Sequence, residues 1–568
     1  TARAARGGWG LQFFHALANA LSFAEGGDVV RALWRFALDF HDWRKPGPGM
    51  PLACHHAVHL HATLLAQLLS VTSQDELLGA ESPLRRTELS DYVVHATRLA
   101  ATVAWEGAGA GADVVLEALL DQLGRALCQL HTLSGRLPPG AAPPAEAWLA
   151  PPAVLREFKR ATASAEQFAT APPPAQVSAD RLLRHVPHGV PFETRVDLLR
   201  ARVQTVREQS HKKVVRLQLR RTHLFEDALL ALADVDWRAR FQVTFVSAAG
   251  LLEQGQDAGG LFKEFLEKLA ETAFDPQYGL FQATESRLLF PNPQAGQYHD
   301  NVERLFEFLG RVIGKAIYEG IVVEPCFAPF FLAKLLGRHN SYYDLQSLDP
   351  ALFANLQQLK SYAGNVSDLC CSFVATSASG EEVPLLPAGH DIPVTSENRL
   401  KYVYLLSDYK LNAELKAGSS AFLAGFQRLV DERWLRMFDE DELQQVISGS
   451  RGSGVDVDDL QRHAQFHNCS AKDKLAADFF SAVKAMSPER QVLLLRFVTS
   501  CSRTPLLGFG HLVPPFTLVK VSVRSDKEKL PTASTCFNTL KLPTYSNWRV
   551  TKEKLEYVIE QGAGFELD

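Results

Sequence analysis

Three stretches rich in proline, glycine, alanine or serine interrupt this 568-residue chain and limit how it can fold. Residues 134–153 and 170–176 contain repeated Pro-Pro steps, and residues 448–454 read SGSRGSG. Such compositions are typical of loops and linkers. We therefore expect four parts: a helical N-terminal region with Pro/Ala-rich linkers (1–180), a second domain (181–447), a hinge (448–454) and a C-terminal domain (455–568).

Apolar periodicity indicates the main secondary-structure elements. Residues 9–24 and 114–133 repeat apolar residues at intervals of three and four, so we expect helices in the N-terminal region. Residues 190–221 form a long basic stretch that we also expect to be helical. Residues 241–246 alternate like a strand. Residues 305–320 are apolar on nearly every face, which is typical of a helix packed inside a domain.

The C-terminal part mixes both kinds of element. Residues 489–498 predict a helix and residues 516–523 predict a strand. A last helix carries Leu555, Val558 and Ile559 on one face. The chain as a whole is therefore expected to belong to the α+β class.

The composition gives no support to two classes of function. The formal charge is −5, from 59 basic and 64 acidic residues, so there is no global reason to expect binding to nucleic acid. No uninterrupted apolar run of about 18 residues occurs, so we expect no membrane span. The first residues, TAR, do not resemble a signal peptide, and the missing initiator methionine favours a piece of a longer protein with domains upstream.

The cysteines show neither a Cys-x-x-Cys pair nor a regular spacing, so we expect no disulfide framework and no zinc ribbon. Reduced thiols in the cytoplasm or the nucleus are the simpler interpretation. The eight are Cys54, Cys128, Cys326, Cys370, Cys371, Cys469, Cys501 and Cys536.

Cys536 is the candidate nucleophile among them. It lies beside Thr532, Ser534 and Thr535 in the stretch LPTASTCFNTLKLP, which lacks the apolar surroundings that a structural cysteine prefers. No histidine follows His511, so a papain-like Cys-His pair would have to form through space. A thiol that exchanges thioesters needs less help, because sulfur is both the incoming and the leaving atom and positioning does most of the work.

Three other motifs compete for a function. His55 and His59 share a helix face, as zinc ligands often do, but an ordinary amphipathic helix explains them better. Residues 202–221 hold seven Lys or Arg and one Glu; a nucleic-acid or calmodulin-like contact is conceivable, and a solvated helix face explains them equally well. Residues 255–260 (GQDAGG) lack the P-loop pattern, so we exclude a nucleotide site. We expect no metal and no organic cofactor.

Nine motifs in order along the chain resemble those of HECT-type E3 ubiquitin ligases, and the resemblance covers roughly residues 210–568. It implies a bilobal HECT domain, with a large, mostly helical N-lobe that binds the ubiquitin-conjugating enzyme (E2) and a small α/β C-lobe that carries the cysteine. Residues 185–196 and the GFELD ending resemble the subgroup of proteasome-associated chain-extending ligases and their plant relatives. The motifs are VTFVSAAGLLEQGQDAGGLFKEFLEKL, FDPQYGLF, LFPNP, FLGRVIGKAIYEG, IPVTSENRLKYVYLLSDYKLN, FLAGFQRLV, LLRFVTSCSRTPLLGF, LPTASTCFNTLKLP and GFELD.

The resemblance also implies roles for single residues. Cys536 matches the family's acceptor cysteine, which takes ubiquitin from an E2 as a thioester and passes it to a substrate lysine. Ser534 stands where many members have histidine, which weakens any role of a local imidazole in deprotonating the lysine. The expected partners are the ubiquitin-charged E2, ubiquitin, protein substrates and, for the subgroup, the proteasome. The residues expected to support the catalytic loop are Thr535, Phe537, Asn538 and Phe565. Those expected to bind the E2 are Leu352, Leu356, Tyr362 and Tyr402.

Two other functions stay open. A non-catalytic HECT-like scaffold would recruit E2 or ubiquitin without transferring it. A cysteine hydrolase would place a histidine beside Cys536 and cleave ubiquitin conjugates. Residues 1–180 have no motif that we can interpret, so a substrate or proteasome contact there is a hypothesis that deletion of the region would test.

Overall fold

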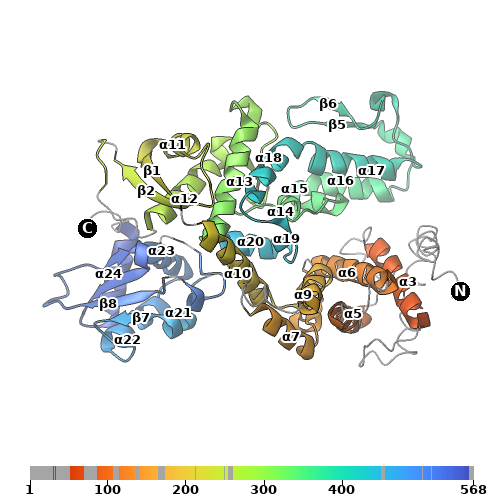
Figure 1. Ribbon diagram of the computed structural model, residues 1–568. Helices are drawn as coiled ribbons and strands as arrows, with labels where there is room; N and C mark the ends of the chain where they lie inside the picture. The colour runs from red at the N-terminus through yellow and green to blue at the C-terminus, as the bar shows by residue number, and fades with distance from the viewer. Residues whose placement is uncertain are drawn as a thin grey trace. The chain divides into compact units, whose positions relative to one another are not determined.

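The chain forms two compact units in a computed structural model (Figure 1). The first unit contains residues 1–205 and Arg433–Asp439, and the second contains Val206–Glu432 and Glu440–Asp568. Within this chain the structure describes residues 30, 32, 52–69, 86–106, 114–135, 137, 140–163, 173–210, 213–247, 250–253, 260–449, 454–499, 501, 503–512 and 514–561.

The described part of the first unit is helical. Helix α3 packs on α6, and α5 packs on α6 and α9. The core contains Leu65, Val93, Leu120, Phe158 and Leu182, all fully buried. The expectation of an all-helical N-terminal region is therefore confirmed for the described residues. The helices are α3 (Leu52–Leu69), α5 (Arg86–Glu106), α6 (Val114–Ser134), α7 (Pro152–Thr162), α9 (Pro173–His185) and the first part of α10 (Phe192–Ser210).

The two stretches expected to be linkers contain regular structure. Residues 145–148 form a 3₁₀ turn whose Trp148 is buried and contacts the rings of His131 and His188. Helix α9 begins at Pro173, inside the second stretch. Proline is well tolerated in the first turn of a helix, where its missing N–H has no intrahelical partner, so Pro-rich composition does not prevent a helix from starting.

The first unit is discontinuous in sequence because Arg195 binds a segment far along the chain. The buried guanidinium donates to the carbonyl oxygens of Val190 and Met437. It also lies over the rings of Phe192 and Phe438, at 5.9 and 5.7 Å from their centroids. Through these contacts residues 433–439 become part of the helical unit, although they lie far along the chain.

The second unit begins with a short parallel sheet. Strand β1 (Val214–Arg220) pairs with β2 (Arg240–Val246), with Val214 opposite Arg240 and Arg220 opposite Val246. The strand expected at residues 241–246 is confirmed. The helix expected over residues 190–221 is wrong in its second half, because α10 ends at Ser210 and the chain then becomes β1. Within β1, Leu217 and Leu219 are buried and alternate with exposed polar side chains, which is a strand period.

Helices α13 (Val302–Glu319) and α18 (Lys416–Gln427) form the centre of what we call the large body, residues 206–432 and 440–449. The two helices lie side by side (Figure 1). They cross where Gly310 meets Gly425. A β-carbon on Gly310 would overlap the carbonyl group of Phe422, lying 2.8 Å from its carbon atom, so the close approach requires glycine. Phenylalanine rings pack around the crossing, among them Phe281, Phe306, Phe327, Phe331 and Phe422.

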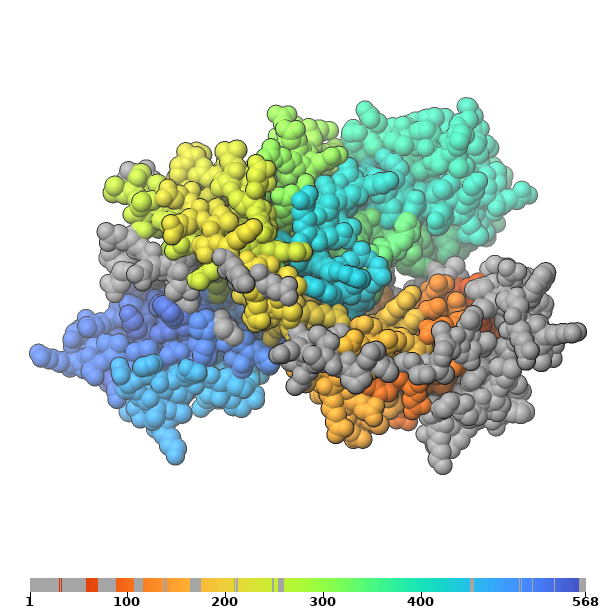
Figure 2. Space-filling model, in the orientation of Figure 1, coloured from red at the N-terminus to blue at the C-terminus, as the bar shows by residue number. Residues whose placement is uncertain are grey.

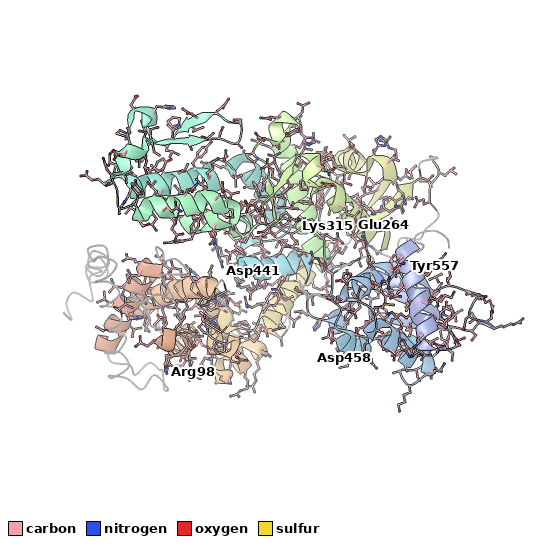
Figure 3. All side chains as sticks on the ribbon, turned by 180° about the vertical axis from the view of Figure 1, so that it is seen from behind. Arg98, Glu264, Lys315, Asp441, Asp458 and Tyr557 are labelled. Carbon is pink, nitrogen blue, oxygen red and sulfur yellow. The ribbon has the colours of Figure 1, made fainter. Side chains whose placement is uncertain are left out.

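Two charged side chains of this body, one buried and one exposed, hold its elements together. Lys315 of α13 is fully buried and donates to the Ala239 carbonyl oxygen at 2.8 Å and to Glu319 at 2.6 Å (Figure 3). Burial lowers the pKa of the Lys315 ammonium. Arg221 binds Glu253 and, at 2.6 Å, Glu264 of α12 (Gly260–Ala273), so it ties the end of β1 to α12.

The other elements of the large body surround these helices. They are α11 (Leu224–Ala231), β3 (Phe281–Ala283), β4 (Leu289–Pro291), α14 (Pro329–Leu335), α15 (Leu345–Leu348), α16 (Pro350–Ser361), β5 (Val374–Thr376), β6 (Glu382–Pro384), α17 (Arg399–Asp408) and α20 (Glu440–Ser448). The short helix α19 (Glu432–Leu435) begins at the last residue before the segment 433–439 of the first unit.

Residues 454–561, which we call the C-terminal body, are drawn in shades of blue in Figure 2. They pack around a four-stranded sheet in the order β7-β8-β10-β9. Only the β9–β10 pair is antiparallel. Phe479, Val498, Leu518, Leu540 and Leu555 are fully buried in its core. The elements are α21 (Val457–His463), β7 (Gln465–His467), α22 (Lys474–Lys484), α23 (Pro488–Thr499), β8 (Thr517–Val521), β9 (Thr532–Ser534), β10 (Thr539–Pro543) and α24 (Trp548–Gln561).

The C-terminal body confirms three expectations from sequence: the helix at 489–498, the strand at 516–523 and the last helix with its apolar face, which is buried. The chain is of the α+β class, as expected. In the part of the chain that the structure describes, each helix is too short or too polar to cross a membrane.

Candidate active site

Cys536 lies in a single helical turn between two antiparallel strands. The turn is η13 (Thr535–Phe537), and it joins β9 to β10. Ser534 at the end of β9 pairs with Thr539 at the start of β10, so four residues make the connection. The side chain of Cys536 lies outside the described part of the structure. Its backbone position is set by the two strands, one of which, β10, also pairs with β8 inside the sheet.

Asn538 closes this turn. Its φ of 48° is in the left-handed region, which asparagine tolerates better than most residues. The side-chain amide is buried and donates to the Pro514 carbonyl oxygen at 2.6 Å. The backbone N–H of Asn538 donates to Thr535, and its carbonyl oxygen accepts from Thr517. Three hydrogen bonds therefore hold the residue that follows the turn.

The other residues expected near the nucleophile differ in exposure. Phe537 is 53% exposed, although aromatic side chains are normally buried, and Thr535 is half-buried. An exposed aromatic ring directly after the cysteine is suited to contact a partner protein. Phe565 lies outside the described residues.

The described helices and strands with the most extensive packing on η13 carry no histidine. Helices α12 and α23 both pack against the turn. Their sequences, GLFKEFLEKLAETA and PERQVLLLRFVT, contain glutamate, lysine and arginine but no histidine. Strands β9 and β10 contain none either.

A second surface contains the residues expected to bind an E2. Leu352 and Leu356 both lie on α16, but Leu356 is only 4% exposed and packs mainly in the core. Leu352 is half-buried, and Tyr362 directly after α16 is exposed. Tyr402 on α17 is half-buried and packs edge-on against Phe373, with ring centroids 5.5 Å apart.

The structure brings these residues together through the contact of α16 with α17. Arg399 of α17 donates to the Tyr362 carbonyl oxygen at 2.8 Å. The same helix exposes Leu400 and Tyr404, at 60% and 58%, which sequence reasoning did not single out. Their spacing of four residues puts them on one helix face, and that spacing is the signal that would have identified them.

The hinge expected at residues 448–454 is only partly described, since residues 450–453 lie outside the described part. Gly449 has a φ of 76°, and a β-carbon there would lie 2.8 Å from the Thr504 carbonyl oxygen. Glycine is therefore required where the chain leaves α20, because of both its backbone conformation and the close approach of Thr504.

The metal and nucleic-acid alternatives gain no structural support. His59 is buried on α3, and the side chain of His55 lies outside the described residues. Among the described residues there is no group of three His, Cys, Asp or Glu side chains suited to hold a metal ion. The basic run 202–221 is divided between the end of α10 and β1, so it does not form one basic helix face.

Comparison with known proteins agrees with this geometry. Residues 267–568 match the family model described as "HECT-domain (ubiquitin-transferase)", which is more than half of the chain. The chain therefore belongs to the HECT-domain family.

Its similarity to curated relatives extends upstream of that match. The chain is 41% identical over 403 residues to the E3 ubiquitin-protein ligase UPL6 of Arabidopsis thaliana, covering 68% of this chain and 39% of the relative. It is 37% identical over 440 residues to the ubiquitin-protein ligase E3B of Mus musculus, covering 68% and 40%. It is 34% identical over 414 residues to the E3 ubiquitin-protein ligase HUL5 of Saccharomyces cerevisiae, covering 68% and 45%. The matched part thus spans less than half the length of each relative.

Proposed function

We propose that this chain carries the catalytic part of an E3 ubiquitin ligase, which accepts ubiquitin from an E2 as a thioester on Cys536 and transfers it to lysines of protein substrates. The observation that carries the proposal is the match to the HECT family over residues 267–568, together with a turn built to present residue 536 between two sheet strands. The names of the relatives, all ubiquitin ligases, support the same activity.

The first chemical step is an exchange between two sulfur atoms. The Cys536 thiolate attacks the carbonyl carbon of the E2–ubiquitin thioester, a new C–S bond forms, and the E2 cysteine leaves as a thiolate. The bond made and the bond broken are of the same kind, so the step is close to thermoneutral. Positioning of the two thiols then supplies most of the rate, through proximity and orientation. A turn held on both sides by the sheet provides that positioning.

The second step is aminolysis. The neutral amine of a substrate lysine attacks the carbonyl carbon of the Cys536 thioester. A C–N bond forms, the C–S bond breaks with the thiolate as leaving group, and the proton that the amine loses passes to the thiolate or to solvent. No metal or organic cofactor takes part in either step.

We assign E2 binding to the surface formed by α16 and α17. Tyr362, Leu400 and Tyr404 are exposed there, and Leu352 and Tyr402 are half-buried beside them. Exposed apolar and tyrosine side chains are typical of protein-binding surfaces. Leu356 contributes mainly by packing beneath this surface, since it is almost fully buried.

Thiol chemistry at Cys536 requires a reducing environment, so we place the protein in the cytoplasm or the nucleus. Substrate or proteasome contacts by residues 1–180 stay a hypothesis. The measurement that tests it is substrate capture by the chain with and without that region; unchanged capture would remove the hypothesis.

The test of the ligase function is a charging reaction. The purified chain is incubated with ubiquitin-activating enzyme, a broadly active E2, ATP and ubiquitin, and run on a non-reducing gel. We expect a band heavier by one ubiquitin that disappears with a thiol reductant and in Cys536→Ala. Cys469→Ala is the matched control, because Cys469 is half-buried in the same body but outside the turn, and it should charge normally.

Two results would contradict the proposal. Undiminished ubiquitin transfer by Cys536→Ala would refute the thioester on this residue. Binding of the charged E2 without any charging of the wild-type chain, across several E2 enzymes, would favour the non-catalytic scaffold instead.

A further inference from the structure

A polar interface joins the large body to the C-terminal body beside the turn that carries Cys536. Helix α12 of the large body and α23 of the C-terminal body both pack against η13. The Lys263 ammonium on α12 donates to the Thr499 carbonyl oxygen at the end of α23. Arg496 on α23 forms an ion pair with Glu271 on α12, with Nη2 and Oε1 2.7 Å apart. Both bonds therefore connect the same two helices.

The residues of α12 that make these bonds lie on one face of the helix. Lys263, Glu267 and Glu271 are four residues apart, and side chains at this spacing are neighbours on a helix surface. Lys263 and Glu271 at the two ends of the face bind α23. Glu267 in the middle lies between them and is only partly accessible to solvent.

Glu267 therefore occupies an interface that is unfavourable for its charged form. Burial raises the pKa of its carboxyl group to about 8, with Glu324 and Glu271 acting in the same direction and Lys263 and Arg496 in the opposite one. Burial also raises the pKa of the neighbouring Cys501 thiol. The charged and titratable groups that face Glu267 are Lys263 and Glu271 on α12, Glu324 after α13, Arg496 on α23 and Cys501 after it.

We propose that the face of α12 formed by Lys263, Glu267 and Glu271 is a docking site for α23, which holds the Cys536 turn against the large body. Ionisation of Glu267 weakens this docking. Release of α23 ionises Glu267 and lets the C-terminal body move about residues 448–454, the proposed hinge. The docked arrangement is one of the positions that a thiol visiting an E2 and then a substrate must adopt and leave.

The sign of the pH dependence follows from proton uptake. When α23 is released, the Glu267 carboxyl faces water and its pKa returns toward the ordinary value of 4.5. Between that value and about 8, docking takes up one proton at Glu267. Docking is then favoured at low pH, and the ratio of docked to released molecules falls by up to about tenfold for each pH unit across this range. Above pH 8 the dependence on Glu267 disappears.

The experiment measures the distance between the two bodies directly. Ketone-bearing residues replace Arg304 on α13 and Glu553 on α24, both exposed, and take spin labels without touching the cysteines. Distance distributions of the full chain are recorded by pulsed electron paramagnetic resonance from pH 6 to 9. We expect a narrow docked population at pH 6 that decreases steeply toward pH 8.

Three variants test whether Glu267 causes the pH dependence of docking. Glu267→Gln keeps a neutral side chain at all pH values, so its docked population should not change with pH. Glu303→Gln, an exposed carboxylate of α13 outside the interface, should respond like the wild type. Arg496→Ala removes the ion pair with Glu271 and should reduce docking at every pH.

Two outcomes overturn the proposal: a wild-type docked population that is the same from pH 6 to 9, or a pH response in Glu267→Gln equal to that of the wild type. The distance measurement does not depend on ligase activity. Failure of Cys536 to accept ubiquitin would remove the proposed function and leave the docking site in place. Normal charging of Cys536 together with a pH-independent distance would refute the proposed docking and leave the proposed ligase function in place.

Discussion

The turn that presents Cys536 depends on Asn538, and the structure gives the size of that dependence. Alanine at this position would lose the hydrogen bond to the Pro514 carbonyl oxygen, worth about 1 kcal/mol net. It would also have to adopt a φ of 48°, which costs an ordinary residue about 1 kcal/mol. The turn therefore loses about 2 kcal/mol of its preference for the native conformation, or roughly 30-fold in the ratio of native to non-native turn.

Glycine separates the two contributions. Asn538→Gly loses the side-chain bond but adopts the left-handed conformation freely, so it should lose about 1 kcal/mol, or roughly fivefold. We expect the rate of Cys536 charging from an E2 thioester to fall by up to about 30-fold in Asn538→Ala and up to about fivefold in Asn538→Gly. The assay is single-turnover discharge of a charged E2, followed on a non-reducing gel.

A matched control separates the effect of changing the Cys536 turn from the effect of backbone strain elsewhere in the same body. Asn468 in the same body also has a left-handed backbone, with a φ of 59°, but it is exposed and lies outside the turn. Asn468→Ala should carry the backbone cost and still charge at the wild-type rate. The reasoning fails if Asn538→Gly is as slow as Asn538→Ala, or if both charge like the wild type.

Two further predictions concern the large body. Gly310→Ala should destabilise the chain by up to about 2 kcal/mol, because a strain of about 1–3 kcal/mol at the α13–α18 crossing is offset by a gain of about 1 kcal/mol in helix propensity. Gly296→Ala, which meets no atom within 4 Å, should change stability by less than about 0.5 kcal/mol in the same urea titration; equal midpoints for the two variants would refute the crossing argument. Tyr404→Ser should weaken E2 binding by about 1–2 kcal/mol, or roughly 5- to 30-fold in Kd by calorimetry, with Tyr557→Ser on α24 as the control that should bind normally (Figure 3). An unchanged affinity of Tyr404→Ser for the E2 would contradict the assignment of E2 binding to the surface formed by α16 and α17.

Sequence reasoning succeeded where a pattern was local and strong. Residues 305–320, apolar on nearly every face, predicted the packed helix α13, and Leu555, Val558 and Ile559 predicted the buried face of α24. Sequence reasoning failed at β1 for two reasons. Residues 202–221 are rich in charges, and only two buried leucines alternate among them. The partner strand β2 also lies more than 20 residues further along the chain.

The site was predictable in its motif and less so in its surroundings. The sequence indicated Cys536 and Asn538 but not the bond from Asn538 to Pro514, which joins residues 24 positions apart. The bonds from Arg496 to Glu271 and from Lys263 to Thr499 span 225 and 236 positions, so no local pattern contains them. The family resemblance put Leu356 among the residues expected to bind the E2, and the packing shows that it is nearly buried.

The discontinuous first unit has a consequence for how the chain is made. Arg195 and the aromatic ring of Phe192 take partners from residues 433–439, which leave the ribosome only after residues 206–432 have been synthesised. At about 5–20 residues per second this interval lasts roughly 10–50 s. During that time the helices of the first unit exist without residues 433–439. When these residues are made, they must pack on the first unit, although the residues on both sides of them belong to the second unit. The order of synthesis therefore makes the N-terminal helices the first part of this chain to emerge and among the last to be completed.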